Sequence, residues 1–325
     1  LRSRLLELSQ TLKSPRDTPD AAVRDEAGVA QAESTEQTGS AEADDDTAPT
    51  DAVVAVPTKR LLLSQLLTPE VFFVPIALAG VVGFFVWEPD LSFYGIAGMV
   101  TATVGTLLQP VRRAMSNYGF TLRDADDRLH IRRGLTERRH QQVPRNRVTA
   151  VTIVRPLLWR RMGWMRATAS NAAYAGQGVS EAFTGGTILP VGTLEEARAV
   201  TTRALSGVDV CDVPVDPTPR RARWCAPIAQ PVLGAKLTDD VFLIRSGRVT
   251  RALTAVPYAR IQSVRVVQGR VQRMLRLATV HADIAGGLTV RTYAEHRDFD
   301  EARQMAEELH ARARRAARAE SEPAA

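Results

Sequence analysis

The chain has 325 residues, enough for two or three domains. Its two cysteines, Cys211 and Cys225, exclude a disulfide framework, and no second pair of ligands lies near them to build a zinc site; we expect two unpaired thiols in a reducing compartment. The formal charge of +6 is unevenly distributed, because residues 15–51 carry a net −9 and the rest of the chain +15. A basic folded part favours an anionic neighbour, either nucleic acid or a membrane surface.

The N-terminal region divides into two parts. Residues 1–13 are predicted to be the end of an amphipathic helix, with four leucines on one side and basic residues around it. Thirteen residues cannot fold alone, so we expect this helix to close a preceding domain and the N-terminus to be incomplete. Residues 14–58 are rich in Ala, Asp, Glu, Thr, Ser and Pro and are predicted to form a disordered acidic linker, because they contain too few large apolar side chains to offset the entropy of ordering.

Two apolar runs follow within residues 59–113. Residues 71–87 are uncharged, and a second uncharged run begins at Leu91 and contains the second predicted helix, 91–108. A bilayer core is about 30 Å thick and needs about 20 helical residues, so we predict a transmembrane hairpin that turns at residues 88–90. Glycines in both runs would allow the two helices to approach closely. The alternative is a buried hairpin of a large soluble domain.

The charges that flank the runs predict the orientation of the hairpin. Lys59 and Arg60 precede the first run, Arg112 and Arg113 follow the second, and the turn between the runs is acidic. The positive-inside rule therefore places both ends in the cytoplasm and the turn outside. With a hairpin present, the membrane is a simpler anionic neighbour than nucleic acid, and we expect no nucleic-acid partner.

The remainder of the chain contains an internal repeat. Residues 128–170 align without a gap to residues 241–283, at an offset of 113 positions. Such a match indicates two copies of one domain. The identical pairs include Ile131/Ile244, Arg132/Arg245, Gly134/Gly247, Arg138/Arg251, Val143/Val256, Pro144/Pro257, Arg147/Arg260, Val151/Val264, Val154/Val267 and Arg160/Arg273.

Each copy is predicted to consist of strands followed by one helix. Apolar residues alternate before the Gly134 turn, and β-branched runs follow it in both copies. Thr193 is a plausible N-cap for a helix over 194–205, and Asp298 for a helix from 299 to about 317. The apolar stripe predicted for the second helix consists of Phe299, Ala302, Met305, Ala306 and Leu309. The predicted boundaries are a first domain at 114–206, a Pro-rich linker at 207–234, a second domain at 235–318 and a disordered tail at 319–325.

These residues resemble a known family. The run RLHIRRGLTERRHQQVPRNRVTAVTI after an apolar hairpin is similar to the bacterial pleckstrin-homology (PH) domain of YdbS/YdbT-like membrane proteins, also called membrane-flanked domains. The second copy carries the pattern closely as VPYARIQSV followed by LATV, whereas the first departs at residues 163–168. The resemblance implies a membrane α-helical hairpin plus an α+β part, made of two tandem PH-like small β-barrels that are each closed by a C-terminal helix.

The candidate binding site is basic and surrounds the Gly134 turn. In PH domains generally, the first hairpin binds phosphorylated head groups, and arginine can hold a phosphate with two hydrogen bonds. The site would then recognise lipids of the inner leaflet; the alternative is a solvated basic face. The candidate lipid-binding residues are Arg132, Arg133, Arg138, Arg139 and His140.

A second cluster combines aromatic and aliphatic residues with arginines. Trp159 and Trp164 lie near Leu157 and Leu158, interleaved with basic residues. One interpretation is barrel core with exposed arginines. The other is a loop that enters the membrane interface with tryptophan at head-group level.

Nothing in the sequence favours catalysis. Its five histidines are scattered, no common nucleophile, zinc-protease or Walker motif occurs, and no metal or cofactor is expected. Asp124, Asp126 and Asp127 are interpreted as an acidic turn, since the rest of a calcium loop is missing.

We therefore expect a non-enzymatic, multi-pass cell-membrane protein that presents tandem PH domains at the cytoplasmic face. It would be a scaffold for other membrane or envelope proteins, including a related PH-domain protein. The alternative function is recognition of anionic lipid head groups through the basic hairpin of the first domain.

Overall fold

The computed structural model describes residues 52–67, 79–80, 105, 114–125, 128–135, 139–171, 186–286 and 290–321. All of them belong to one compact unit, Ala48–Ala325. Within these residues no helix is long and apolar enough to cross a membrane. The predicted helix of residues 1–13 and nearly all of the predicted hairpin lie outside the described residues; residues 79–80 and 105 are helical.

The first repeat starts earlier than predicted. Its first sheet has the order β1-β2-β3-β4, all antiparallel. Strand β1 lies within the range predicted to be a disordered linker, so that prediction is wrong for residues 52–55. The reason is local composition, because acidic residues stop at Asp51 and the next five are Ala or Val, of which Val54 and Val56 are buried. The strands are β1 (Ala52–Ala55), β2 (Thr121–Ala125), β3 (Arg128–Arg133) and β4 (Arg139–Pro144).

Helix α2 (Thr58–Leu66) follows β1 and precedes the apolar runs. The described part of the first repeat therefore starts before the two apolar runs, is interrupted after Leu67 and resumes at Ala114. The predicted domain 114–206 lacks its first strand and this helix. The sequence repeat could not reveal them, because the gapless match starts only at Arg128.

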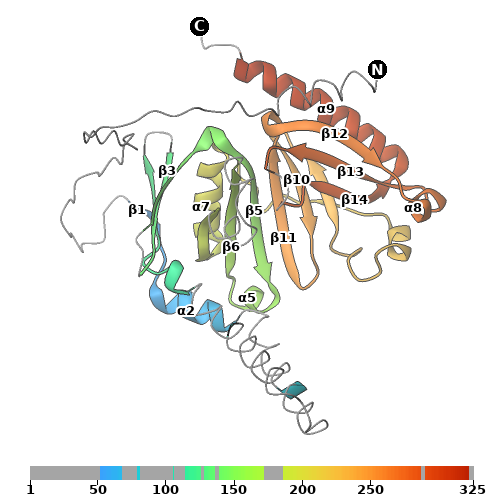
Figure 1. The fold of residues 1–325 in the computed structure, drawn as a ribbon. Helices are drawn as coiled ribbons and strands as arrows, with labels where there is room; N and C mark the ends of the chain where they lie inside the picture. The colour runs from blue at the N-terminus through green and yellow to red at the C-terminus, as the bar shows by residue number, and fades with distance from the viewer. Residues whose placement is uncertain are drawn as a thin grey trace, which may run out of the picture. The chain divides into compact units, whose positions relative to one another are not determined.

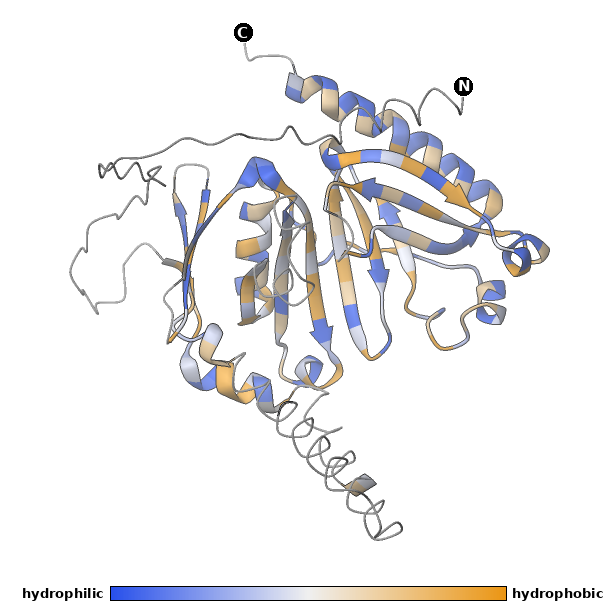
Figure 2. Cartoon of the chain, in the orientation of Figure 1, coloured by the Kyte–Doolittle hydropathy of each residue, from blue (hydrophilic) through white to orange (hydrophobic). Residues whose placement is uncertain are grey.

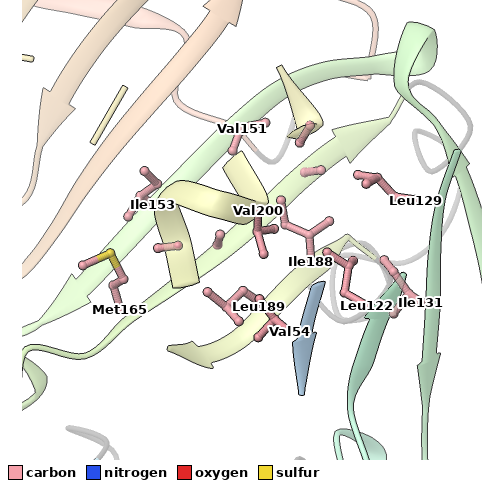
Figure 3. Close-up of a cluster of buried hydrophobic side chains, with 14 of the residues drawn as sticks. Val54, Leu122, Leu129, Ile131, Val151, Ile153, Met165, Ile188, Leu189 and Val200 are labelled. Atoms are coloured by element: carbon pink, nitrogen blue, oxygen red, sulfur yellow. The ribbon is translucent and has the colours of Figure 1, made fainter. Parts of the chain in front are cut away.

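The second layer of the first repeat consists of three strands and a helix. After a short 3₁₀ helix, η1 (Arg145–Arg147), come β5 (Val148–Pro156), helix α5 (Leu157–Arg161), β6 (Met165–Asn171) and β7 (Thr187–Gly192). Side chains of this layer and of β1 to β3 converge on one core, to which Val200 of helix α7 (Leu194–Ala204) also contributes (Figure 3).

Helix α7 (Leu194–Ala204) confirms the predicted N-cap. The Thr193 hydroxyl accepts a hydrogen bond from the Glu196 amide at 3.3 Å, and the Glu196 carboxylate accepts one from the Thr193 amide at 2.8 Å. Two amides at the helix start are thereby satisfied. The helix begins where the sequence predicts it and buries Ala197 and Val200.

The second repeat has the same order of elements. Four strands, β8 (Asp216–Pro217), β9 (Gly234–Leu237), β10 (Val241–Ser246) and β11 (Thr250–Pro257), precede η4 (Tyr258–Arg260). A sheet of β12 (Ile261–Val267), β13 (Leu277–Ile284) and β14 (Tyr293–Asp298) follows, with α8 (Arg270–Met274) between its first two strands. Several elements repeat at the predicted offset of 113: β3 and β10, η1 and η4, and α5 and α8 have matching bounds.

Helix α9 (Phe299–Ser321) ends the second repeat and packs on η4, β12 and β13. Its predicted apolar stripe is confirmed, since Ala302, Met305 and Leu309 are buried and Phe299 and Ala306 pack against the same core. Figure 2 shows hydrophilic and hydrophobic residues alternating along this helix.

The predicted linker 207–234 is also part of the fold. It contains β8 and the 3₁₀ helix η3 (Arg220–Trp224), and five of its apolar side chains are buried. Arg297 of β14 holds it in place, because its guanidinium donates to the carbonyl oxygens of Asp216 at 2.8 Å and Pro217 at 3.1 Å. The prolines mark turns in this segment, not a free tether. The buried side chains are Val210, Val215, Ala222, Val232 and Leu233.

The α+β architecture with antiparallel sheets and a C-terminal helix is confirmed, but the sheets do not separate into two independent barrels. Strand β5 of the first repeat pairs with β11 of the second, so one seven-stranded sheet runs β7-β6-β5-β11-β10-β9-β8 (Figure 1). A repeat in sequence does not specify which strand edges will meet, and this joint could not be predicted.

Candidate membrane-facing surface

The chain enters its apolar region from α2, which is fastened to the first repeat. Leu61 and Ser64 are buried, and the Ser64 carbonyl accepts a hydrogen bond from the Trp159 indole at 3.2 Å. Arg60 pairs with Glu196 of α7 at 2.7 Å. The remaining side of α2 exposes Leu62 and Leu63, and Figure 2 shows the mixed hydropathy of this helix. The entry point is thus rigidly placed and partly apolar.

The chain returns from the apolar region beside the β3–β4 turn. The Gly134 amide donates to the Tyr118 carbonyl at 2.9 Å, and the Leu135 amide donates to the Met115 carbonyl at 3.0 Å. Gly134 has φ +110°, a conformation that side-chain-bearing residues rarely adopt. Met115, Tyr118 and Leu135 are exposed around this contact. The turn predicted to bind head groups therefore lies against the first residues after the predicted hairpin.

The five predicted lipid-binding residues do not form one group. Arg132 is exposed, whereas Arg133 on the same strand is only 4% exposed and donates to Gln141 at 3.4 Å. The alternation of β3 separates them, because Leu129, Ile131 and Arg133 share its inner side. Arg133 is therefore not available to a head group, and the prediction is wrong for this residue.

The pairing of β3 with β4 sets the positions of two others. Arg139 lies opposite Arg133, and His140 lies opposite Arg132. Arg138 lies outside the described residues, as do the side chains of Arg139 and His140. Lipid contact by Arg132, Arg138, Arg139 and His140 stays a prediction.

The tryptophan cluster is mainly core. Trp159 is fully buried, with the Arg166 guanidinium 5.5 Å from its ring centre, and Trp164 and Leu158 pack against the same core. Of the aromatic and aliphatic residues in the cluster only Leu157 is exposed, and Met162, which follows the helix, is exposed as well. The interpretation of tryptophans at head-group level is therefore wrong for Trp159, because its ring fills the space under α2.

Helix α5 also contacts the second repeat. The Arg160 guanidinium donates to the carbonyl oxygens of Arg248 and Val249, both at 2.8 Å, in the β10–β11 turn. Partial burial lowers the pKa of Arg160, and the nearby charge of Arg251 lowers it further. Val249 is exposed at the tip of this turn. The contact places an apolar tip of the second repeat beside Leu157 and Met162.

We call this set of exposed apolar side chains the basal surface. It draws on α2, the return segment, the β3–β4 turn, α5 and the β10–β11 turn, and Figure 1 shows α2, α5 and the lower end of β11 at the same end of the unit. Exposed apolar groups gathered in this way mark a contact with a partner or a membrane. Its members are Leu62, Leu63, Met115, Tyr118, Leu135, Leu157, Met162 and Val249.

The acidic turn has a structural role at Asp124. This residue lies in β2 and pairs with Arg145 of η1 and with Arg203 of α7, the latter at 3.4 Å. Within the described residues, no group of three or more potential ligands could hold a metal ion.

Sequence reasoning missed the contributions of α2 and the β10–β11 turn to this surface, and it missed β1 as a strand of the first repeat. For β1 a signal was present, the run AVVAV directly after Asp51, where the acidic N-terminal stretch ends. The surface as a whole had no signal, because its residues are brought together by hydrogen bonds between segments far apart in the chain.

The comparisons with known proteins agree with the repeat. The family described as Bacterial PH domain matches residues 71–206 and again residues 232–313, more than half of the chain in total. The first match includes both apolar runs. No curated protein and no solved structure matches the chain. From its sequence match, its repeated architecture and its two antiparallel layers followed by a helix, the chain belongs to the Bacterial PH domain family.

Proposed function

We propose that this protein is a non-enzymatic, membrane-anchored scaffold that holds two bacterial PH repeats against the cytoplasmic face of the cell membrane. The observation that carries the proposal is the basal surface, where exposed apolar side chains surround the two points at which the chain leaves and re-enters the first repeat. An apolar surface next to a predicted membrane hairpin would be covered by the interfacial region of the bilayer.

The attachment of both ends supports close contact with the bilayer. Helix α2 is held by Arg60, Leu61 and Ser64, and the return segment is held by the β3–β4 turn. Only three residues separate Leu67 from the start of the first apolar run at Val71. A hairpin spanning the membrane would thus keep the first repeat within a few residues of the surface.

The joint between the repeats supports a scaffold role. Strand β5 of one PH repeat already binds strand β11 of another along six residue pairs. Pairing at strand edges is a common way for such domains to bind protein partners. Related PH-domain proteins in the same membrane are therefore the partners we propose.

The proposed topology can be tested by cysteine labelling in intact cells. In a chain with Cys211→Ser and Cys225→Ser, Asp90→Cys should react with a membrane-impermeant maleimide from outside. Glu307→Cys, exposed on α9, should react only after the cells are permeabilised. Labelling of Glu307→Cys in intact cells, or release of the protein from membranes by alkaline carbonate, would overturn the proposal.

A second candidate function, recognition of anionic head groups, is favoured by the contact between the β3–β4 turn and the return segment. These two backbone hydrogen bonds would hold exposed Arg132 near the inner leaflet. Each basic residue near an anionic surface contributes about 1 kcal/mol, or roughly fivefold in affinity.

We predict that the detergent-solubilised full chain binds short-chain phosphatidylglycerol more tightly than phosphatidylcholine, in a salt-sensitive manner. Arg132→Ala/Arg139→Ala should weaken phosphatidylglycerol binding about tenfold or more, measured by microscale thermophoresis. Arg314→Ala/Arg315→Ala, at exposed positions of α9, is the matched control and should have no effect. Equal affinity for both lipids, or equal loss in the control, would exclude recognition by this hairpin.

A further inference from the structure

The contact between the two repeats is a specific strand pair with a defined register. Val154 of β5 lies opposite Ala252 of β11, and Val151 lies opposite Ala255, in antiparallel orientation. The Thr152 and Thr254 hydroxyls lie 3.2 Å apart across the same pair. The edge strand β5 of the layer β5–β7 thus pairs with the edge strand β11 of the layer β8–β11, which belongs to the next repeat.

The internal repeat supplies the same two edges once more. At the offset of 113, β5 corresponds to β12 and β11 corresponds to β4. In the described part of the chain, β12 is an edge strand of its three-stranded sheet and β4 an edge strand of its four-stranded sheet. The chain therefore carries one joined pair of these edges and a second, unjoined pair.

Apolar positions of β5 and α5 that are covered in the first repeat are exposed at the equivalent positions of the second. Ile153 of β5 is 4% exposed, whereas Val266 at the equivalent position of β12 is 38% exposed. Leu158 of α5 packs against the core, whereas Val271 of α8 is 56% exposed. Val267 and Met274 complete this apolar edge, and Met274 is 84% exposed. A long, apolar, uncovered edge strand is unusual unless a partner covers it.

The arginine that fastens the joint is also repeated. Arg160 donates to two carbonyl oxygens of the β10–β11 turn, and its equivalent on α8 is Arg273. Arg273 is exposed and donates no side-chain hydrogen bond to any described residue. At the same offset, the acceptor carbonyl of Arg248 corresponds to the carbonyl of Leu135.

Charge does not oppose a second joint. In the existing joint Arg155 lies directly opposite Arg251, yet the strands pair. At the position equivalent to Arg155 the second repeat has the uncharged Gln268, which removes one of these two charges. Arg265 of β12 is neutralised by Asp283, whose carboxylate accepts from it at 2.7 and 2.8 Å. These hydrogen bonds lower the pKa of Asp283, so the pair stays ionised near neutral pH.

We propose that β12 and α8 of one chain dock on β4 of a second copy of this chain, antiparallel, with Val267 opposite Arg139 and Val264 opposite Gln142. The contact joins two different edges, so it is head-to-tail and extends to a ring or a row of chains in the membrane. This inference rests on the proposed scaffold function, because it identifies the partner of the scaffold as a second copy of the same chain. The strand pairing itself needs no bilayer.

The test uses two differently tagged full-length chains, both with Cys211→Ser and Cys225→Ser. One carries Val267→Cys and the other Arg139→Cys. On mild oxidation in membranes and again in detergent, we expect a disulfide-linked species that contains both tags. The matched positive control is Val154→Cys/Ala252→Cys in one chain, which reproduces the register of the existing joint and should form an intramolecular disulfide.

A charge placed on the exposed edge gives an independent measurement. Val266→Lys should abolish the mixed cross-link and return the detergent-solubilised protein to a single-chain mass in light scattering. Ile228→Lys, at an exposed position of residues 207–234, should change neither the mixed cross-link nor the mass measured by light scattering.

The inference would be overturned if the control disulfide forms but no disulfide-linked species contains both tags. A disulfide-linked dimer of two Val267→Cys chains would also overturn it, because that dimer indicates symmetric pairing of β12 with β12. Failure of the membrane proposal would appear in a different measurement, the release of the chain from membranes by carbonate. The cross-link does not depend on that result, because it is also measured in detergent.

Discussion

At the scale of single residues, buried arginines connect segments that hydrophobic contacts alone would leave loose. Arg297 is 2% exposed and holds the linker strand β8 by two carbonyl oxygens, while also pairing with Glu301 of α9. A charge-assisted hydrogen bond is about twice as strong as a neutral one. The segment 207–234 is thereby held to the second repeat through a side chain that the sequence does not distinguish from the exposed arginines.

We predict that Arg297→Met lowers the free energy of unfolding by about 3 kcal/mol, because two carbonyl oxygens of β8 lose a charged donor and Glu301 loses its buried partner. Thermal unfolding of the full chain in detergent measures the effect. Arg303→Met, at an exposed position of α9, is the control and should stay within about 0.5 kcal/mol of the parent. A change no larger than the control would show that Arg297 does not hold the linker.

At the scale of elements, β1 and α2 belong to the first repeat although the predicted hairpin separates them from it in sequence. Strand β1 pairs with β2, and Val54, Val56 and Leu61 enter the core. Burying an aliphatic side chain fully contributes about 1.5–3 kcal/mol. Such contributions are comparable to the whole stability of a small domain.

We therefore predict that a fragment of residues 114–325 unfolds at a much lower temperature than a fragment of residues 52–325 in which 69–112 are replaced by a flexible Gly/Ser linker. The first fragment lacks three core side chains and exposes the edge of β2. Circular dichroism on heating compares the two. Equal melting temperatures would mean that β1 and α2 are dispensable.

At the scale of the whole molecule, the seven-stranded sheet couples the two repeats. The β5–β11 pair brings elements of both repeats into contact, and Ala255 and Val241 of the second repeat lie in the core of the first. Ala150 of β5 lies in the core of the second. Since each core contains side chains of the other repeat, we expect the two repeats to unfold in one transition.

Arg160→Ala is predicted to lower stability by about 1–2 kcal/mol, because it removes two hydrogen bonds between the repeats at a partly exposed site. Its neighbour Arg161 is exposed and makes no such contact, so Arg161→Ala should be nearly neutral. Differential scanning fluorimetry of the two variants gives the comparison. Equal melting temperatures would contradict a role of Arg160 at the joint.

The sequence by itself determined the repeated unit, its family and its local structure. The offset of 113, the Thr193 cap and the stripe on α9 were all readable, because strand alternation, capping and helical periodicity depend on neighbours within a few residues. The sequence also located the basic residues around the Gly134 turn. It did not reveal that Arg133 is buried, because that depends on which side of β3 faces the core.

Only the tertiary structure decided how these units meet. That β1 completes the first repeat, that β5 joins β11, and that α5 and the β10–β11 turn share one end all depend on pairing between residues about 70 to 100 positions apart. Backbone hydrogen-bonding groups are the same at every strand edge, so the sequence leaves the choice of partner open. Side-chain packing and the geometry of the whole chain make that choice.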